Sequence, residues 1–346
     1  MHNFTWNGLR LRIQSLNVQV GSNQLELRRC FRNAEGTPIL LLSGFLDSSQ
    51  IFLPNFNSST QDKGGLAPFL ASEGYDVYLA DLRGKGNSWP QASRRADWGL
   101  HEAICEDIPA HLSMIEKIRP GVSQFWMGQD LGSLLLLATF ARGHTVQDSS
   151  QTSVSSPLAL HSPVLGMAHF SASRRRTNEN WMMKSKYSSW NAYCTFSRVM
   201  AGYIGLPFGE SVSRETIGAF ETWRQWQSAE QWQDPVDNYD YRQALTASAL
   251  PPSLYFANDE HELWGSPTDC RALIRELGPH DGRMIIVGKK GGNDRNYSIN
   301  GLLRHPASRQ DHFVQLKNWL EEHNPRMHEQ KSYDESVKNT PNLESA

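Results

Sequence analysis

The segment that most constrains the fold is a short apolar strand that runs into a glycine-flanked turn and then into an apolar helix. The strand is expected over 125–127 and the helix over 134–140, with Gly128-Gln129-Asp130-Leu131-Gly132 between them. A turn this tight leaves no room for a side chain beside its central residue, so the two glycines are needed. The pattern therefore predicts an elbow at which Asp130 is presented between the end of a strand and the start of a helix.

Strands alternate with helices along most of the chain. Alternating apolar and polar residues over 9–31 predict paired antiparallel strands. Further strands are expected over 38–42, 75–80, 158–160, 252–257 and 283–287, and helices over 66–73, 101–118 and 313–322. This order predicts an α/β fold with a mostly parallel central sheet flanked by helices.

One segment interrupts the alternation and defines the expected domains. Residues 164–245 are rich in Trp, Arg, Ser and Tyr and favour helices and loops. We therefore predict a core in two parts, 1–163 and 246–324, with a helical cap inserted at 164–245. Residues 325–346 are polar and charged, and are expected to form a disordered tail. A chain of 346 residues is long enough for this arrangement.

Composition excludes several classes of function. The net charge is −2, from 34 basic and 36 acidic residues, which favours neither nucleic acid nor an anionic membrane surface. No apolar run is long enough for a transmembrane segment, and the N-terminus lacks the features of a signal peptide. The four cysteines lie far apart, without metal-ligand spacing. We expect buried, reduced thiols in a cytoplasmic protein with neither metal nor cofactor, and the sequence leaves its oligomeric state open.

Three segments together resemble the α/β-hydrolase superfamily, in particular bacterial lipase- or esterase-like members with a cap. Residues 41–49 (LLSGFLDSS) are similar to the family's oxyanion segment LLxHGxxxSS, with Ser43 in place of histidine. Residues 80–88 (ADLRGKGNS) are similar to its DxRGxGxS stretch, and residues 128–132 to its nucleophile elbow Gly-x-Ser-x-Gly. The resemblance spans roughly residues 25–323 and implies the α/β-hydrolase fold.

The resemblance also implies positions for the catalytic groups. The backbone N–H of Leu131 and that of Phe45 or Leu46 would form the oxyanion hole. The catalytic acid would follow the strand at 253–257, where Asp259 and Glu260 are candidates and His261 is an alternative occupant. The resemblance places Ile299 at the position of the usual catalytic histidine.

Asp130 stands where the family has its nucleophilic serine. A carboxylate is ionised at neutral pH and needs no base to attack carbon. Aspartate nucleophiles occur in the epoxide hydrolase and haloalkane dehalogenase branches, which form an alkyl-enzyme ester that a histidine-activated water cleaves. Those branches usually carry tryptophan where this chain has Leu131. Candidate bases are His261, His305 and His312. Two other roles for Asp130 stay open: a structural cap at the helix N-terminus, or an acid–base group whose pKa is raised by burial.

Aromatic residues concentrate in the expected cap. Trp190 and Trp223, with Ser43 and Ile299, are expected to line an apolar pocket above the elbow. Other candidates for lining this cleft are Trp181, Tyr187, Tyr203, Phe220, Trp226 and Trp232. The alternative is that these aromatics form the small core of the cap itself. The run Arg174-Arg175-Arg176 is expected on a solvated face.

These residues predict a protein that acts on a hydrophobic small molecule, such as an ester, an epoxide or a lipid-like compound. Asp130 and His261 would carry the chemistry, with Asp259 as the acid, and standard serine hydrolysis is not expected. The alternative function is a catalytically inactive pseudoenzyme that binds a ligand or a partner.

Overall fold

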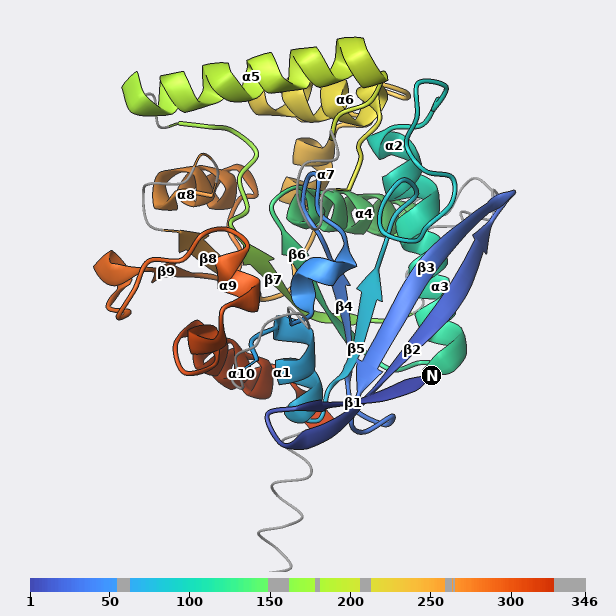
Figure 1. Ribbon diagram of the computed structural model, residues 1–346, viewed down its shortest axis with the longest axis vertical. Helices are drawn as coiled ribbons and strands as arrows, with labels where there is room; N and C mark the ends of the chain where they lie inside the picture. The colour runs from blue at the N-terminus through green and yellow to red at the C-terminus, as the bar shows by residue number, and fades with distance from the viewer. Residues whose placement is uncertain are drawn as a thin grey trace, which may run out of the picture.

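The strands of the described chain form one mixed sheet (Figure 1). The computed structural model describes residues 1–54, 63–148, 162–177, 181–205, 213–258, 263 and 265–326, and only the backbone of 144–148. Within these residues the strand order is β1-β2-β3-β5-β4-β6-β7-β8-β9. The strands are β1 (His2–Trp6), β2 (Leu9–Val20), β3 (Asn23–Phe31), β4 (Pro38–Leu42), β5 (Asp76–Ala80), β6 (Gln124–Gln129), β7 (Val164–Phe170), β8 (Ser253–Asn258) and β9 (Gly282–Val287).

Strand direction divides the sheet into two parts. Strands β1, β2, β3 and β5 pair antiparallel, whereas β5, β4, β6, β7, β8 and β9 run parallel. All residues of β4 and β6 are buried, because both faces of a parallel sheet are covered. In the pairing of β4 with β6, Leu42 lies opposite Gly128. The ends of these two strands, and the loops that follow them, are therefore neighbours.

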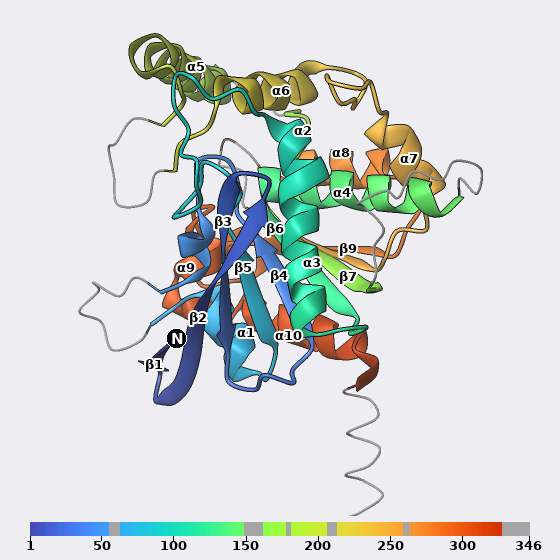
Figure 2. The same cartoon turned by 90° about the vertical axis from the view of Figure 1, so that its right-hand side faces the viewer.

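Helices cover the sheet on both faces (Figure 2). One face packs against α2, α3, α4 and α8, and the other against α1, α9 and α10. The helices are α1 (Leu66–Ser72), α2 (Leu100–Glu102), α3 (Ile108–Ile118), α4 (Leu131–Asp148), α5 (Trp181–Ala201), α6 (Ile217–Ser228), α7 (Tyr241–Ala247), α8 (Pro267–Glu276), α9 (Gly301–Arg304) and α10 (His312–Glu322). A single π-turn, Ala103–Asp107, joins α2 to α3.

Three helices between β7 and β8 depart from the layered arrangement. In both views α5 and α6 lie above the sheet, and we call this pair the cap helices (Figures 1 and 2). Residues of α6 and α7 join the same buried cluster as residues of α4. The cap helices are therefore packed onto the core and share its apolar interior.

One strand of the sheet lies in the segment that the sequence assigned to the cap. Residues 158–160, expected as a strand, lie outside the described residues, and β7 occupies the start of that segment. The helical insertion therefore begins after Phe170. Gly166 disguised the strand, because glycine weakens a strand pattern. It is needed there, since an added Cβ would lie 2.6 Å from the ring of Trp319.

Candidate active site at the Asp130 elbow

Asp130 occupies the turn between β6 and α4, where the glycine spacing predicts it. Its φ is +46°, a left-handed conformation that is unusual for a residue other than glycine. An added Cβ at Gly128 would lie 2.4 Å from the backbone nitrogen of Ser133, and one at Gly132 would lie 2.4 Å from the carbonyl oxygen of Leu42. Helix and strand are thus too close for side chains at either glycine, and the turn directs Asp130 toward the loop after β4.

The two oxygens of the Asp130 carboxylate have different surroundings. The N–H of Phe45 donates to Oδ2 at 3.4 Å. Oδ1 is buried and has no hydrogen-bond partner among the described residues. The side chain is buried, with 8% of the residue exposed. A buried oxygen without a partner is costly and is rare in folded proteins, so this atom is a candidate to meet a ligand.

Burial raises the pKa of Asp130 to about 6. The N–H groups of Leu131 and Phe45 and the charge of Lys85 act in the opposite direction, and the negative charge of Asp47 adds to the rise. Of the N–H groups proposed for an oxyanion hole, that of Phe45 donates to this carboxyl group, and that of Leu131 favours its charged form. At neutral pH the group is mainly ionised.

A buried ion pair holds the loop that supplies the Phe45 N–H. Nζ of Lys85 lies 2.7 Å from Oε1 of Glu215 and also donates to the carbonyl oxygen of Gly44 at 2.7 Å. The same Glu215 oxygen accepts from the N–H of Leu46 at 3.1 Å. Leu46, the second oxyanion candidate, is therefore engaged by Glu215 and has a φ of +59°. The sequence did not identify Glu215, and Lys85 was visible only as a variable position within the DxRGxGxS resemblance.

A second carboxylate lies close to Asp130. Burial raises the pKa of Asp47 to about 6. Nε2 of Gln129 donates to Oδ2 of Asp47 at 3.3 Å and to Oδ1 of Asn300 at 3.4 Å, while its Oε1 accepts from the N–H of Gly44. Gln129 therefore connects the loop after β4 to the chain before α9. Asp47 belongs to the LLSGFLDSS segment, but its residue type alone gave no reason to single it out.

The histidines proposed as bases differ in their placement. His261 and Asp259 lie outside the described residues. Nδ1 of His305 accepts from the N–H of Ala307, and Nε2 of the buried His312 lies 2.8 Å from the carbonyl oxygen of Leu302. Burial lowers the pKa of His312 to about 4. Both histidines thus have structural contacts at the entry to α10.

The remaining expected pocket residues lie around the same loop. Oγ of the buried Ser43 donates to the carbonyl oxygen of Asp47 at 3.1 Å. Ile299 is half-buried and precedes Asn300, the contact of Gln129. Trp223 is buried and stacks on Phe45, with ring centroids 4.3 Å apart, and Trp190 meets the same ring edge-on at 6.1 Å. Aromatic rings of the cap helices therefore cover the loop directly.

Several aromatics expected to line a cleft serve other purposes. Trp226 and Trp232 are buried and pack edge-to-face with each other and around Tyr241, as a core of the inserted segment. Trp181 is 81% exposed at the start of α5. Trp226 and Trp232 therefore follow the alternative expectation, that these aromatics are buried within the inserted segment, whereas Trp181 lies on the surface and lines no cleft.

The expectation of a solvated arginine run was also wrong for one residue. Arg174 is buried and forms an ion pair with Glu276 at 2.5 Å. Its guanidinium also donates to backbone carbonyl oxygens of the inserted segment, at Trp226 and Ala229. A buried charge requires such partners, and the sequence gives no sign of them.

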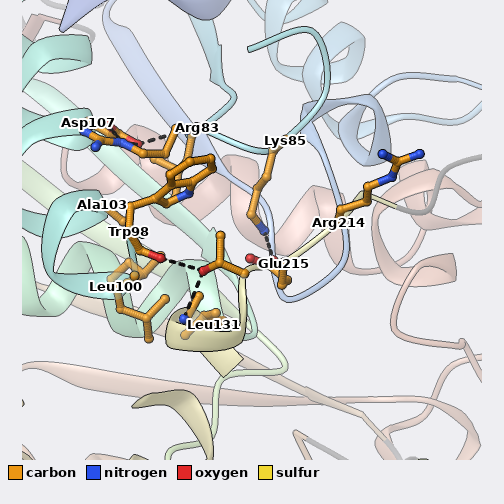
Figure 3. A pocket seen from close by; sticks show the side chains of 14 residues that line it. Arg83, Lys85, Trp98, Leu100, Ala103, Asp107, Leu131, Arg214 and Glu215 are labelled. Carbon is orange, nitrogen blue, oxygen red and sulfur yellow. Dashed lines mark hydrogen bonds and ion pairs between the residues drawn. The ribbon is translucent and has the colours of Figure 1, made fainter. Parts of the chain in front are cut away.

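A small cavity adjoins the elbow (Figure 3). Its volume is about 20 Å³, enough for roughly one water molecule. Leu131 from the elbow, Lys85 and Glu215 contribute to its wall, together with Trp98, Leu100 and Ala103. The cavity therefore has room for a water molecule next to Lys85 and Glu215, which contact the loop after β4.

Comparisons with known proteins agree with this architecture. A profile of the family described as serine aminopeptidase, S33, matches residues 51–197. A bacterial membrane phospholipase A has a TM-score of 0.51 at 12% identity, over 88% of this chain and 86% of that chain. A loop variant of the haloalkane dehalogenase DbeA from Bradyrhizobium elkanii has a TM-score of 0.51 at 15% identity, over 89% of this chain and 98% of that one. This chain has the α/β-hydrolase fold.

The α/β-hydrolase fold accounts for the position of the elbow at the end of a central parallel strand. A search of curated proteins gives no match to this sequence. Among the described residues, no helix is both long and apolar enough to cross a membrane. The described cysteines Cys30, Cys105, Cys194 and Cys270 are free thiols, and three of the four are buried.

Proposed function

We propose that this α/β-hydrolase-fold protein cleaves a hydrophobic small molecule by using Asp130 as a nucleophile on carbon. The observation that most supports this proposal is that the two oxygens of the Asp130 carboxylate have different surroundings. Oδ2 accepts from the N–H of Phe45, whereas Oδ1 is buried and has no hydrogen-bond partner in the described part of the chain. A carboxylate held by one oxygen presents the other to a substrate in a fixed direction, which is a main source of catalytic rate.

The first step would form an alkyl-enzyme ester. Oδ1 of Asp130 supplies an electron pair to an electrophilic carbon of the substrate, and the bond from that carbon to its leaving group breaks. A halide leaves as the anion, and an epoxide oxygen leaves as an alkoxide that takes a proton from water. The Asp130 carboxyl becomes an ester whose carbonyl oxygen is Oδ2, still facing the amide of Phe45.

The second step would hydrolyse that ester. Water adds to Cγ of Asp130, and negative charge develops on Oδ2, where the N–H of Phe45 stabilises it. The intermediate releases the product alkoxide, which takes a proton to become an alcohol, and the carboxylate is restored. We propose Asp47 as the group that accepts the proton of the attacking water, since its charge acts on Asp130 and burial raises its own pKa to about 6.

Intact-mass analysis tests the first step. The protein is incubated with a panel of epoxides, alkyl halides and esters, and adducts are located by peptide mapping. We expect a covalent adduct on Asp130 with at least one compound and none with Asp130→Asn. Turnover in water enriched in heavy oxygen should also transfer the label into the Asp130 carboxylate, because that oxygen comes from the attacking water.

The Asp47→Asn variant tests the second step. Loss of the proton acceptor should slow cleavage of the ester more than its formation, so the adduct accumulates. Gln24→Ala, at an exposed position on β3, is the matched control and should behave as the unchanged protein. An adduct on a residue other than Asp130, or label that never enters Asp130, would contradict the proposed nucleophile.

The alternative function is a catalytically silent binding protein, and one observation favours it. Trp223 stacks on Phe45, and the cavity beside Leu131 has room for about one water. Little open space is therefore present beside the elbow for a substrate. Absence of adduct and turnover, together with tight binding of a hydrophobic ligand that survives Asp130→Asn, would establish this second function instead.

A further inference from the structure

Helix α5 presents an unusual outer face. Its inner residues are spaced for packing, and Met183, Cys194 and Ser197 are buried beneath it. The residues of the opposite stripe are three or four positions apart and are all exposed: Trp181, Ser185, Ser188, Ala192, Phe196 and Val199. None of these six residues is charged. An exposed helix face normally carries charged residues, so the uncharged outer face of α5 indicates a surface that binds a partner.

The apolar side chains on this face are large and well exposed. Trp181 is 81% exposed, Phe196 56% and Val199 66%, and the neighbouring Met200 is 61% exposed. They lie at the two ends of the helix, with only serine and alanine between them. A helix of 21 residues is about 30 Å long, so the face is a flat strip with an apolar anchor at either end.

The charged residues within α5 all have one sign. Helix α5 contains Lys184, Lys186 and Arg198 and no acidic residue, although the whole chain has a net charge of −2. Arg198 forms an exposed ion pair with Glu221 of α6, and the two lysines are exposed near the other end. Arg94 adds a cation beside Met200, since its guanidinium donates to the Met200 carbonyl oxygen at 3.1 Å. The balanced composition of the chain conceals this local excess.

We propose that the outer face of α5 docks on the surface of an anionic lipid bilayer. Exposed aromatic and aliphatic anchors next to basic residues are typical of helices that lie in the headgroup region. Tryptophan is well suited to that position, because its ring is apolar and its N–H is polar. The positive charge on α5 complements anionic headgroups, which attract nearby lysine and arginine side chains.

This face is also connected to the elbow. Trp190 of α5 points inward and meets the ring of Phe45, whose N–H donates to Asp130. A bilayer bound to the outer face would therefore lie above the aromatic rings that contact Phe45. The proposed docking does not depend on the reaction at Asp130. A bound bilayer would supply hydrophobic molecules from the side of the cap helices.

Vesicle flotation with the full chain tests this proposal. The two samples are pure phosphatidylcholine and an equimolar mixture of phosphatidylcholine and phosphatidylglycerol, at low salt. We expect flotation with the mixture, little with phosphatidylcholine alone, and weakening as salt is added. The triple variant Trp181→Ser, Phe196→Ser, Val199→Ser should lose at least about tenfold in affinity.

Two further variants separate the contributions. The double variant Lys184→Gln, Lys186→Gln should lose about fivefold for each lysine and show a weaker dependence on salt. The control Trp89→Ser, Val236→Ser removes exposed apolar residues outside α5, 63% and 64% exposed, and should bind as the unchanged chain does. Asp130→Asn should also bind unchanged, so failure of the proposed reaction and failure of docking are distinguishable.

Three outcomes would overturn the proposal. The first is no flotation with the equimolar mixture at low salt. The second is equal flotation by the unchanged chain and the triple variant. The third is self-association through α5, in which the chain floats with neither vesicle and the triple variant converts an oligomer to a monomer in sedimentation. That result would assign the face to a second copy of the chain.

Discussion

Asp130 combines two features that oppose folding. Its left-handed backbone conformation costs an aspartate on the order of 1 kcal/mol, and its carboxylate is buried with one oxygen that lacks a partner among the residues the structure describes. The N–H groups of Phe45 and Leu131 offset only part of the cost of burial, since the pKa of Asp130 remains above its ordinary value. Such a residue is typical of a site where stability is traded for reactivity or binding.

Removing the charge should therefore stabilise the protein. We expect Asp130→Asn to raise the free energy of unfolding by about 1–3 kcal/mol at pH 8, because the amide keeps the shape without a buried charge. The folded-state pKa of about 6 lies above the ordinary value of 3.8. Burial of Asp130 thus costs no stability below about pH 3.8, where the carboxyl group is protonated in both states. The full cost applies above about pH 6. The gain should shrink as pH falls between these values in denaturant titrations, and a gain that grows toward acid pH would contradict this account.

The same pKa sets the expected pH dependence of the chemistry. A protonated carboxyl does not attack carbon, so the rate of adduct formation on Asp130 should fall about tenfold per pH unit below about 6 and level off above it. The measurement is the initial rate of adduct formation by intact mass at a series of pH values. A rate that is independent of pH through this range would argue against Asp130 as the attacking group.

The serines near the elbow should be inert toward serine-directed reagents. Oγ of Ser133 donates to the carbonyl oxygen of Gly128, and Oγ of Ser43 donates to that of Asp47. Both residues are buried, and no described histidine contacts either hydroxyl. We expect no labelling by a fluorophosphonate probe. Asp130→Ser alone should also give no strong esterase activity, because Ile299 supplies no base, whereas adding Ile299→His improves the prospect. Stoichiometric labelling of Ser43 or Ser133 would refute this.

At the scale of elements, a buried ion pair connects three segments that are distant in the sequence. Lys85 follows β5, Glu215 precedes α6, and both contact the loop after β4 at Gly44 and Leu46. The side chains of Lys85 and Glu215 are both nearly inaccessible to solvent. The two buried charges therefore compensate each other, and each also forms a hydrogen bond with the backbone of the loop.

Breaking this pair should be costly. We expect Lys85→Met to destabilise the protein by about 3–5 kcal/mol, because Glu215 would be left buried without its counter-charge. The double variant Lys85→Met, Glu215→Gln should recover part of the loss, since the glutamine carbonyl oxygen can still accept from the Leu46 N–H. Equilibrium unfolding of both variants measures this difference. A single variant that is as stable as the unchanged chain would show that the pair contributes little.

At the scale of the molecule, the inserted helices and the sheet share one apolar interior. Leu131 and Trp126 of the core belong to the same buried cluster as Trp223, Trp226 and Tyr241 of the insertion. Arg174 adds a polar connection, because it pairs with Glu276 of α8 and binds the backbone after α6. The insertion therefore has no separate core of its own size that could fold alone.

This shared interior predicts cooperative unfolding of the described chain. Near-ultraviolet circular dichroism reports mainly the tryptophans, five of which (Trp181, Trp190, Trp223, Trp226 and Trp232) lie between β7 and β8, and far-ultraviolet dichroism reports the helices and strands of the whole molecule. We expect the two signals to change at the same denaturant concentration. An earlier near-ultraviolet transition would show that the cap helices detach before the sheet unfolds.

Local patterns predicted most of the fold. The apolar run of β4, the alternation in β2 and β3 and the glycines around Asp130 each encode a conformation within a few residues, so the strands, the elbow and α10 occur where expected. Strand β7 was misplaced because Gly166 serves a contact with Trp319 far along the chain. Likewise, the exposed Trp181 and the buried Trp226 are indistinguishable by residue type.

The sequence by itself determined that an aspartate occupies a glycine-flanked elbow in an α/β chain. Only the tertiary structure decided what surrounds it: the Phe45 amide, the Asp47–Gln129 contact, and the Lys85–Glu215 pair. Periodicity and turn chemistry depend on neighbouring residues and can be read from the chain, whereas a hydrogen bond between residues 130 positions apart leaves no local pattern. The environment that raises the pKa of Asp130 is a property of packing, and it exists only once the sheet and the cap helices have assembled.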